Sequence, residues 1–550
     1  MKPHLFSNLH RDETVKNIKN THFDLIVIGG GITGAGILLD AASRGLKTLL
    51  VEKEDFASGT SSKSTKLIHG GLRYLKQFDF WLVKEVGTER AIVHKLAPHL
   101  VIPEKMLLPL IENGVYGKWL TSIGLKIYDL LAQVNDEDQR KMVDKNEALA
   151  LEPLLPEDIL KGAGFYAEYR TDDARLTLEN IKTALQFGAK AINYTEVKNF
   201  AYQNDQINGL EVSDLVTQNN YTISAKYVVN ATGPWVDELR LLNKSVKGGN
   251  LHLTKGVHLV FPHHKLPIKQ SVYFDVPDGR MIFAIPRGKI TYAGTTDTNY
   301  TLDKNEVYTT LPDALYLIEA VNNMFPEINL TLDDIESSWA GLRPLIHEEG
   351  KSPSELSRKD EIFISASGLI SIAGGKLTGY RKMAERTVDI VSKRMEENFS
   401  IKTSKCTTDK IALTGGLWKN YEEVKHYKKL LHDHLKTEGF STFDVAYLTH
   451  TYGKQTEEIL KLYRNFSEGN PQEKMIKAEF HFTAQHELIQ TPIDFFVRRT
   501  GRLYFDIESV KTHLSLILNE YQKLFKVNDS EITFYNKKML ELIEKHSKIT

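Results

Sequence analysis

The stretch FDLIVIGGGITGAGILLDAASRGLKTLLVEK, residues 23–53, predicts a strand, a glycine turn, a helix and a second strand in direct succession. FDLIVI is a short apolar run rich in branched residues, as a strand buried in a parallel sheet requires. Gly29, Gly31 and Gly34 form the pattern G-x-G-x-x-G. This spacing allows a tight turn, close approach of a pyrophosphate and close packing of helix on strand. The helix N-terminus would direct its free N–H groups at the phosphates.

Glu52 stands at the end of the second predicted strand. A carboxylate there can accept a hydrogen bond from a ribose 2′-hydroxyl, which argues against a 2′-phosphorylated nucleotide. The pattern alone leaves FAD and NAD both open. The cofactor contacts predicted from this unit are Ile28, Gly29, Gly30, Gly31, Ile32, Thr33, Gly34, Glu52 and Lys53.

The composition is that of an ordinary globular protein, with 41% hydrophobic and 26% charged residues in 550. A chain of this length predicts about two to four domains. The formal net charge of −1 provides no global field that would favour nucleic acid as a partner. Cys406 is the single cysteine, which excludes an internal disulfide and a cysteine-based metal cluster. It suits a reducing compartment.

The sequence contains no apolar run of about 18 residues, so no transmembrane helix is expected. Residues 1–22 lack the apolar core of a signal peptide and are interpreted as an N-terminal extension. No acidic calcium-binding loop is present, and no metal site is predicted.

A loop rich in hydroxyl groups follows Glu52: DFASGTSSKSTKLIHGGLRYL, residues 55–75. Its serines can donate hydrogen bonds to phosphate or ring oxygens, and its glycine pair lets the backbone lie close to a flat ring. The loop is therefore predicted to wrap a cofactor. The contacts expected from it are Thr60, Ser61, Ser62, Ser64, His69, Gly70 and Gly71.

The segment GTSSKSTKLIHGGLRYL strongly resembles the FAD-dependent, quinone-reducing glycerol-3-phosphate dehydrogenases, which are membrane-associated flavoproteins of the D-amino-acid oxidase-like group. KGVH (255–258) and GGKLTGYRK (374–382) match the same family in the expected order, so the resemblance covers nearly the whole chain. NATGPW (230–235) resembles the A-T-G segment of flavoproteins that have two dinucleotide-binding motifs. It implies an α/β fold with a Rossmann-like FAD-binding domain, an antiparallel β-sheet substrate domain and a C-terminal α-helical domain.

The resemblance also implies domain limits. Residues 23–400 would form a discontinuous FAD-binding domain, interleaved with a substrate domain at about 78–165 and 245–345. Residues 401–550 would form the helical domain, after the linker IKTSKC. Residues 78–150 look helical from the sequence.

A second glycine-terminated strand, KYVVNATGPWVDEL at residues 226–239, favours FAD over NAD when taken with the first motif, and noncovalent binding is expected. In such folds a residue near Val197 meets the adenine through its backbone. The turn at residues 374–378 would offer N–H groups to the O2 edge of a flavin. These segments add Val197, Ala231, Thr232, Gly233, Gly374, Gly375, Lys376, Leu377 and Thr378 to the predicted cofactor contacts.

Oxidation of a secondary alcohol needs a base, and His258 is the best candidate because an imidazole titrates near neutral pH. His69 is its rival. Arg343, held before Pro344, would steady the substrate oxygen, and Lys376 would assist. Arg73 and Tyr74 are expected to bind the substrate phosphate, and Arg280 is a further candidate for substrate binding. The sequence leaves open how Arg73, Arg280, Arg343 and Lys376 divide between the phosphate and the C2 oxygen.

The resemblance implies oxidation of sn-glycerol 3-phosphate to dihydroxyacetone phosphate in glycerol catabolism, with electrons passed through FAD to a membrane quinone. The implied location is the cytoplasm, with peripheral contact at the inner face of the cell membrane. The oligomeric state is left open, with a homodimer among the options. The alternatives are an oxidase that reduces oxygen, an amine or amino-acid oxidase on the same fold, and a flavin-binding module without turnover.

Three segments have a structural interpretation beside a functional one. The apolar pattern of residues 116–132 predicts an amphipathic helix that suits either the core or a membrane surface. The acids of YRTDDARL, residues 169–176, are expected to cap and form salt bridges. RRTGRL, residues 498–503, departs from the family pattern R-R-T-R, so Arg498 and Arg499 are expected to form structural salt bridges.

Overall fold

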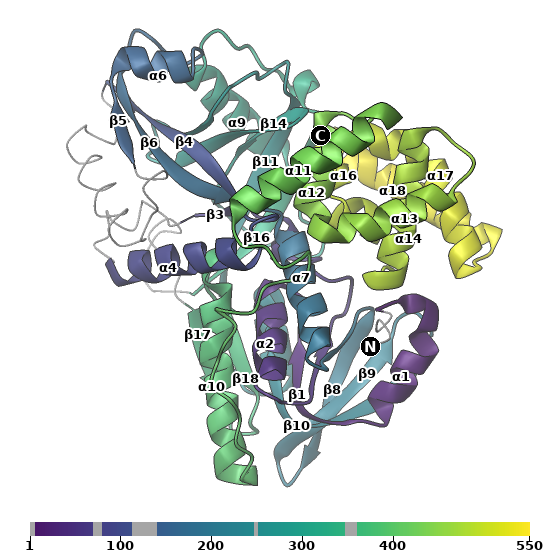
Figure 1. Ribbon diagram of the computed structural model, residues 1–550. Coiled ribbons are helices and arrows are strands. Elements are labelled where there is room, and N and C mark those ends of the chain that lie inside the picture. Colours follow the sequence, from purple (N-terminus) through teal and green to yellow (C-terminus); the bar gives the residue numbers. More distant parts are fainter. Residues whose placement is uncertain (1–5, 70–79, 113–139, 247–250, 347–359, 550) are drawn as a thin grey trace.

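The computed structural model describes residues 6–69, 80–112, 140–246, 251–346 and 360–549. Two β-sheets and a group of C-terminal helices make up this part of the chain (Figure 1). The predicted fold class, with a dinucleotide-binding sheet, a second sheet and a helical region, is confirmed.

The first sheet carries the glycine turn and has the strand order β17-β18-β10-β1-β2-β7. Its central pairs are parallel, and only β17 is antiparallel to its neighbour within this order. β8 and β9 form an antiparallel hairpin, and β9 also pairs with β10. The strands are β1 (His22–Ile28), β2 (Thr48–Val51), β7 (Lys190–Ile192), β8 (Thr195–Gln203), β9 (Gln206–Asp214), β10 (Asn220–Asn230), β17 (Asp360–Ile364) and β18 (Ile370–Gly374).

The apolar run of β1 is buried on both faces, as its composition predicts. Leu25 and Val27 pack in one core cluster with residues of α2 (Ile32–Ser43) and α10 (Tyr380–Phe399). Ile26 and Ile28 point to the opposite face and join a cluster with β8–β10 and α1 (Arg11–Lys19). This packing on both faces fixes the end of β1, where the glycine turn begins.

The second sheet has the order β15-β11-β14-β13-β12-β4-β6-β3, with β16 beside β11 and β5 beside β6. All its pairs are antiparallel except β12–β4. The strands are β3 (Leu67–Ile68), β4 (Ile102–Ile111), β5 (Lys141–Val143), β6 (Leu160–Arg170), β11 (Leu251–Pro262), β12 (Ser271–Asp275), β13 (Met281–Arg287), β14 (Ile290–Gly294), β15 (Thr298–Asn299) and β16 (Ser337–Ile346).

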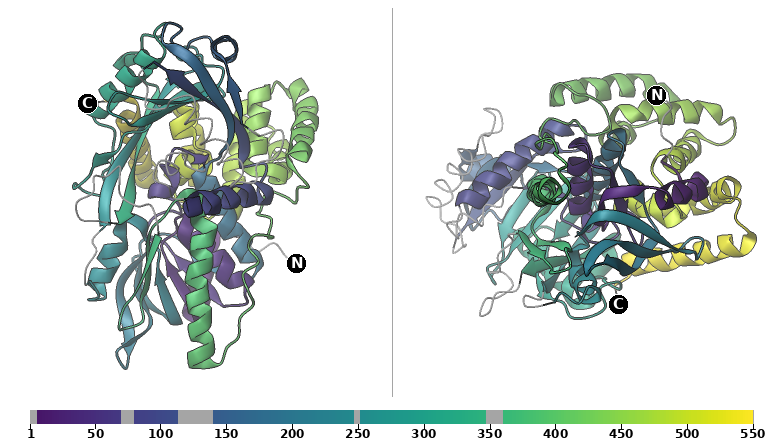
Figure 2. Two further views of the ribbon diagram at one scale, coloured as in Figure 1. Left: turned by 90° about the vertical axis from the view of Figure 1, so that its left-hand side faces the viewer. Right: turned by 90° about the horizontal axis from the view of Figure 1, so that it is seen from below.

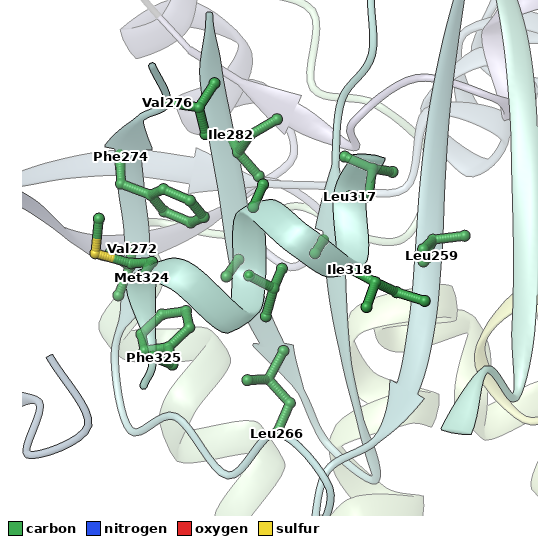
Figure 3. Packing of buried hydrophobic residues seen from close by; sticks show 14 of the residues in the cluster. Leu259, Leu266, Val272, Phe274, Val276, Ile282, Leu317, Ile318, Met324 and Phe325 are labelled. Carbon is green, nitrogen blue, oxygen red and sulfur yellow. The ribbon is translucent and has the colours of Figure 1, made fainter. Parts of the chain in front are cut away.

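One face of the second sheet is covered by α9 (Leu311–Met324), whose apolar side chains interdigitate with those of the strands. Figure 3 shows this cluster, which includes Leu259, Val272, Phe274, Ile282, Leu317, Ile318, Met324 and Phe325. The buried layer holds β11, and therefore His258, in a fixed position.

The helical prediction for residues 78–150 is partly wrong. α4 (Phe80–Leu96) and α6 (Lys145–Leu151) are helices, but IPEKMLLPLI at 102–111 is strand β4, paired along almost its whole length with β6. Pro103 and Pro109 disfavour a helix there. The amphipathic stretch 116–132 lies outside the described residues. Among the described helices, none is long and apolar enough to span a membrane.

The C-terminal helices pack beside both sheets, and Figure 2 shows them on one side of the molecule. Phe480 and Phe495 share a core cluster with Tyr292 and Trp339 of the second sheet. The elements are α11 (Tyr421–Leu435), α12 (Thr442–Tyr452), α13 (Thr456–Asn465), α14 (Pro471–His486), α15 (Pro492–Asp494), a π-helical turn (Phe495–Arg499), α16 (Arg502–Phe505), α17 (Ile507–Phe525) and α18 (Asp529–Ser547).

The acidic pair of the DDARL segment has the structural roles expected of it. Asp172 caps α7 (Asp173–Gln186) and accepts the N–H of Arg175 at 3.1 Å. Asp173 is buried and forms an ion pair with Lys66. This pair fastens the hydroxyl-rich loop to the start of α7.

Candidate functional site

Two adjoining cavities lie where the two sheets meet. The first, of about 450 Å³, extends from the glycine turn past the ends of β2 and β8. The second, of about 160 Å³, lies between the hydroxyl-rich loop and strands β11 and β16. Both cavities share a wall formed by Ile32, Thr60, Ser61, Pro344, Gly375, Lys376 and Leu377.

The three motif glycines have different physical roles. Gly29 has φ +109°, and a Cβ on it would lie 2.6 Å from the carbonyl oxygen of Ala231. A Cβ on Gly34 would lie 1.9 Å from the carbonyl oxygen of Gly29. The fold therefore requires these two glycines. Gly31 has φ −78°, and its Cβ would meet only the Ser61 hydroxyl, at 3.1 Å. Its missing side chain instead leaves space in the first cavity, at the N-terminus of α2.

The carboxylate of Glu52 lies in the wall of the first cavity, as predicted for a ribose ligand. One of its oxygens accepts the N–H of Gly30 at 2.6 Å, and the other accepts the N–H of Glu54 at 2.9 Å. Desolvation raises the pKa of Glu52 to about 7, although the two N–H donors oppose the shift. The carboxylate is thus held against the glycine turn by fixed hydrogen bonds.

The hydroxyl-rich loop supplies residues to both cavities. Ser61 accepts the N–H of Ile32 at 2.9 Å, and Thr60 donates to the carbonyl of Leu342 at 2.7 Å. Ser64 and His69 line the second cavity. Ser62 lines neither cavity; it is buried, and its carbonyl accepts a hydrogen bond from Lys66 at 2.9 Å. Four predicted site residues lie outside the described part of the chain: Gly70, Gly71, Arg73 and Tyr74.

The remaining predicted cofactor residues fall at the two cavities with two exceptions. Gly30 and Gly34 line neither cavity and instead shape the turn. The first cavity is also lined by Ile28, Thr33, Lys53, Val197, Ala231, Thr232, Gly233 and Gly374, and the second also by Thr378.

His258 is a buried residue of β11 with 1% exposure, and it lines the second cavity. Its ring stacks on Trp339 at 4.7 Å, and its Nε2 hydrogen-bonds the Thr65 hydroxyl at 3.0 Å. Within the described residues Nδ1 has no hydrogen-bond partner. Desolvation, with help from the positive charges of Arg343 and Lys66, lowers the pKa of His258 well below 6.5. The imidazole is therefore neutral at neutral pH.

Arg343 lies on β16, directly beside β11, and also lines the second cavity. Its guanidinium donates to the Thr296 carbonyl at 3.0 Å, to Asp297 at 3.0 Å and to the Thr295 hydroxyl at 2.8 Å. It passes over Gly256, where a Cβ would lie 2.2 Å from Nη2. Together with Lys376, which lies in the shared wall, it makes this cavity cationic.

Arg280 is not brought to the site. It precedes β13 in the β12–β13 hairpin turn, pairs with Asp278 at 3.4 Å and lies over the ring of Tyr316 at 5.3 Å. It lines neither cavity. The predicted role of Arg280 in substrate binding is therefore not supported, because its contacts are with Asp278 and Tyr316 and not with the residues of the two cavities.

Several residues of the site were not predicted individually. Lys63 and Thr65 line the second cavity, and the ring of Trp339 stacks on that of His258. The indole N–H of Trp339 also donates to the Ser64 carbonyl at 3.1 Å. The only signal for them in the sequence was their place in the hydroxyl-rich loop or within a few residues of Arg343. Within the described ranges no group of three or more His, Cys, Asp or Glu could hold a metal ion.

The geometry fits a flavin dinucleotide. The first cavity offers a glycine cradle, a helix N-terminus and a ribose carboxylate. The second offers a neutral histidine beside cationic side chains and adjoins the first through a glycine-containing wall. An elongated cofactor can therefore place its nucleotide end in one cavity and its reactive end at the other.

Comparisons with known proteins agree with this geometry. Residues 24–381 match the family described as FAD dependent oxidoreductase, and residues 406–532 match the C-terminal domain of alpha-glycerophosphate oxidase. The aerobic glycerol-3-phosphate dehydrogenase of Bacillus subtilis (strain 168) is 49% identical over 529 residues, covering 96% of this chain and 95% of the relative. The enzyme of the same name from Staphylococcus aureus (strain USA300) is 47% identical, covering 98% and 97%.

Two solved structures are also similar. The glycerol-3-phosphate dehydrogenase from Bacillus halodurans complexed with FAD has a TM-score of 0.84 and 42% identity, covering 99% of both chains. The L-alpha-glycerophosphate oxidase from Mycoplasma pneumoniae, with FAD bound, has a TM-score of 0.55 and 20% identity, covering 70% of this chain and 97% of its own. The second likeness concerns the fold alone.

Proposed function

Because this chain belongs to the family of FAD-dependent glycerol-3-phosphate dehydrogenases, we propose that it oxidises sn-glycerol 3-phosphate to dihydroxyacetone phosphate and passes the electrons to a membrane quinone. The observation that carries the proposal is the convergence of His258, Arg343 and Lys376 on one small cavity beside the dinucleotide cavity. FAD, when bound, supplies the hydride acceptor for such a reaction. The residues that would hold it are the glycine turn, Glu52 and the 374–378 turn.

We propose that His258 is the base that accepts the proton of the substrate C2 hydroxyl. A neutral imidazole keeps one ring nitrogen unprotonated, and the lone pair on that nitrogen can accept the proton of a substrate in the second cavity. The low pKa keeps the imidazole in the accepting form at neutral pH. His69 also lines the second cavity and stays the rival base.

We propose that Arg343 stabilises the C2 oxygen of the substrate. As the proton leaves, negative charge develops on this oxygen, and a guanidinium already fixed by three hydrogen-bond acceptors can stabilise it without reorganising. Lys376 in the shared wall adds positive charge at the same place. Arg73 and Tyr74 are the proposed ligands of the substrate phosphate.

Replacing Arg73 with Ala should raise KM for glycerol 3-phosphate by about 10–100-fold and leave kcat nearly unchanged. The reason is that a phosphate contact is equally strong in the ground state and the transition state, and hydrogen bonds to charged groups contribute about 1.5–3 kcal/mol. Steady-state kinetics would measure this. Arg280→Ala is the matched control and should leave KM unchanged, because Arg280 lies outside both cavities. An unchanged KM for Arg73→Ala would remove Arg73 from the phosphate site.

The pH dependence of kcat/KM should differ from that of an enzyme whose base is an exposed histidine, which titrates near neutral pH. Because the pKa of His258 lies well below 6.5, the base is already unprotonated at pH 6.5. We expect kcat/KM to stay level from about pH 8 to pH 6.5 and to fall only at lower pH, after correction for the phosphate ionisation of the substrate near pH 6. A limb centred at or above pH 6.5 would show instead that this imidazole titrates like an exposed histidine.

Comparing electron acceptors tests the part of the proposal that names a membrane quinone. We expect the purified protein to turn over glycerol 3-phosphate faster with a quinone analogue than with dissolved oxygen, and phospholipid vesicles to raise the quinone-dependent rate, because quinones partition into the bilayer. A parallel measurement of hydrogen peroxide tests the alternative function, an oxidase that passes its electrons to oxygen. Fast peroxide formation, with no advantage for the quinone, would favour the oxidase. A cytoplasmic location with peripheral membrane contact belongs to the same proposal.

A further inference from the structure

A buried carboxylate links the C-terminal helices to the nucleotide loop. Asp55 lies three residues beyond Glu52 and is 0% exposed. Arg499 donates from Nη1 and Nη2 to its two oxygens at 2.7 and 2.8 Å, and Arg498 donates from Nε to one of them. The side-chain amide of Asn193 donates a hydrogen bond to Oδ1 of Asp55 at 3.1 Å. The expected structural salt bridges of both arginines are thus confirmed, and their partner is a residue next to the cofactor site.

The two guanidinium groups are themselves fixed. Arg499 donates twice to the Glu487 carbonyl, at 3.0 and 2.8 Å, and Arg498 donates to Asp494 at 2.7 Å. Glu487 follows α14 and Asp494 ends α15, so both anchors belong to the helical region. Neither arginine lines either of the two cavities described above. Their effect on the cofactor must therefore pass through Asp55.

The residues on either side of Asp55 hold the glycine turn. Glu52 accepts the N–H of Gly30 at 2.6 Å, and the N–H of Ala57 donates to the Gly30 carbonyl at 3.0 Å. The ring of Phe56 packs so closely on Gly30 that a Cβ there would lie 2.7 Å from it. A displacement of Asp55 would therefore move both the ribose carboxylate and the turn that faces the pyrophosphate.

We propose that Arg498 and Arg499 are positioning residues for FAD, holding through Asp55 the loop that carries Glu52. The C-terminal helices thereby become part of the cofactor site without touching the cofactor. Burial alone would raise the pKa of Asp55, but the two arginines outweigh it and hold that pKa below its usual value. A buried carboxylate that lost these partners would be strongly destabilised, so the loop would have to rearrange.

The test uses the holoenzyme and compares two equivalent substitutions. Lysine cannot reproduce the two-pronged contact of arginine, so Arg499→Lys should break one arm of the pair with Asp55. Arg502→Lys is the matched control: the Arg502 side chain is 13% exposed and pairs at 2.7 Å with Glu479, which is also a residue of the helical region. We expect Arg499→Lys to release FAD about tenfold faster. Arg502→Lys should stay within about twofold of the parent rate. Release is followed by flavin fluorescence after dilution, and unfolding by circular dichroism.

A double-mutant comparison tests whether the effect of Arg499 on FAD release passes through Asp55. If the effect passes through Asp55, then Asp55→Asn combined with Arg499→Lys should accelerate release by much less than the product of the single effects. If Arg499→Lys fails to fold, Arg498→Lys replaces it. Parent-like release from the arginine variant, or equal acceleration in Arg502→Lys, would overturn the proposal. The readout involves no substrate, so it stands or falls independently of the proposed reaction and acceptor.

Discussion

Replacing His258 with Ala should lower kcat by about 10²–10⁴-fold, the usual contribution of a positioned general base. The effect should fall on kcat because the proton is transferred in the chemical step, whereas the phosphate contacts that set much of the binding are untouched. Stopped-flow reduction of the bound flavin under anaerobic conditions measures this step directly, without any contribution from the electron acceptor.

Two controls make the result specific to the imidazole. His258 stacks on Trp339, so its removal leaves a cavity, and the FAD content and the unfolding temperature of the variant must be compared with the parent. His252→Ala changes a histidine on the same strand that lines neither cavity and should leave kcat near the parent value. Near-normal turnover in His258→Ala, together with a large loss in His69→Ala, would transfer the role of base to His69.

Replacing Gly31 with Val should give a folded protein that retains no detectable FAD. The backbone at Gly31 has an ordinary negative φ, and an added Cβ meets only the Ser61 hydroxyl, so the fold should tolerate a side chain. That side chain would occupy the first cavity where the pyrophosphate must approach. Forcing atoms into a filled site costs about 3 kcal/mol at the upper end of the usual range, so we expect affinity to fall by roughly 100-fold.

Graded substitutions separate a filled cofactor site from a damaged fold. Gly31→Ala should weaken FAD binding less than Gly31→Val, because its side chain is smaller. Gly34→Val should fail at the level of folding, since its Cβ would overlap the Gly29 carbonyl. The measurements are the flavin absorbance of the purified protein, titration of the apoprotein with FAD, and circular dichroism. A yellow, stoichiometrically loaded Gly31→Val protein would contradict the assignment of the first cavity.

The sequence by itself determined the dinucleotide-binding unit. Strand, turn, helix and second strand are consecutive, so the contacts that define them are local, and the glycine spacing together with Glu52 identifies the unit from its residues alone. The same holds for His258 and Arg343, whose surrounding motifs are continuous segments. Segments 374–378 and 60–64 were recognised in the same way, with Ser62 alone turned away from the cavities.

Only the tertiary structure decided which of the predicted cations face the site. Arg280 lies in the β12–β13 hairpin turn and lines neither cavity, whereas Arg343 lies within β16 and lines the second cavity together with His258. The strand at 102–111 is likewise defined by pairing with β6, a partner that its own sequence does not contain. The bond between Asp55 and Arg499 joins residues 444 positions apart. Sequence patterns report local periodicity, and contacts across such separations depend on how the whole chain packs.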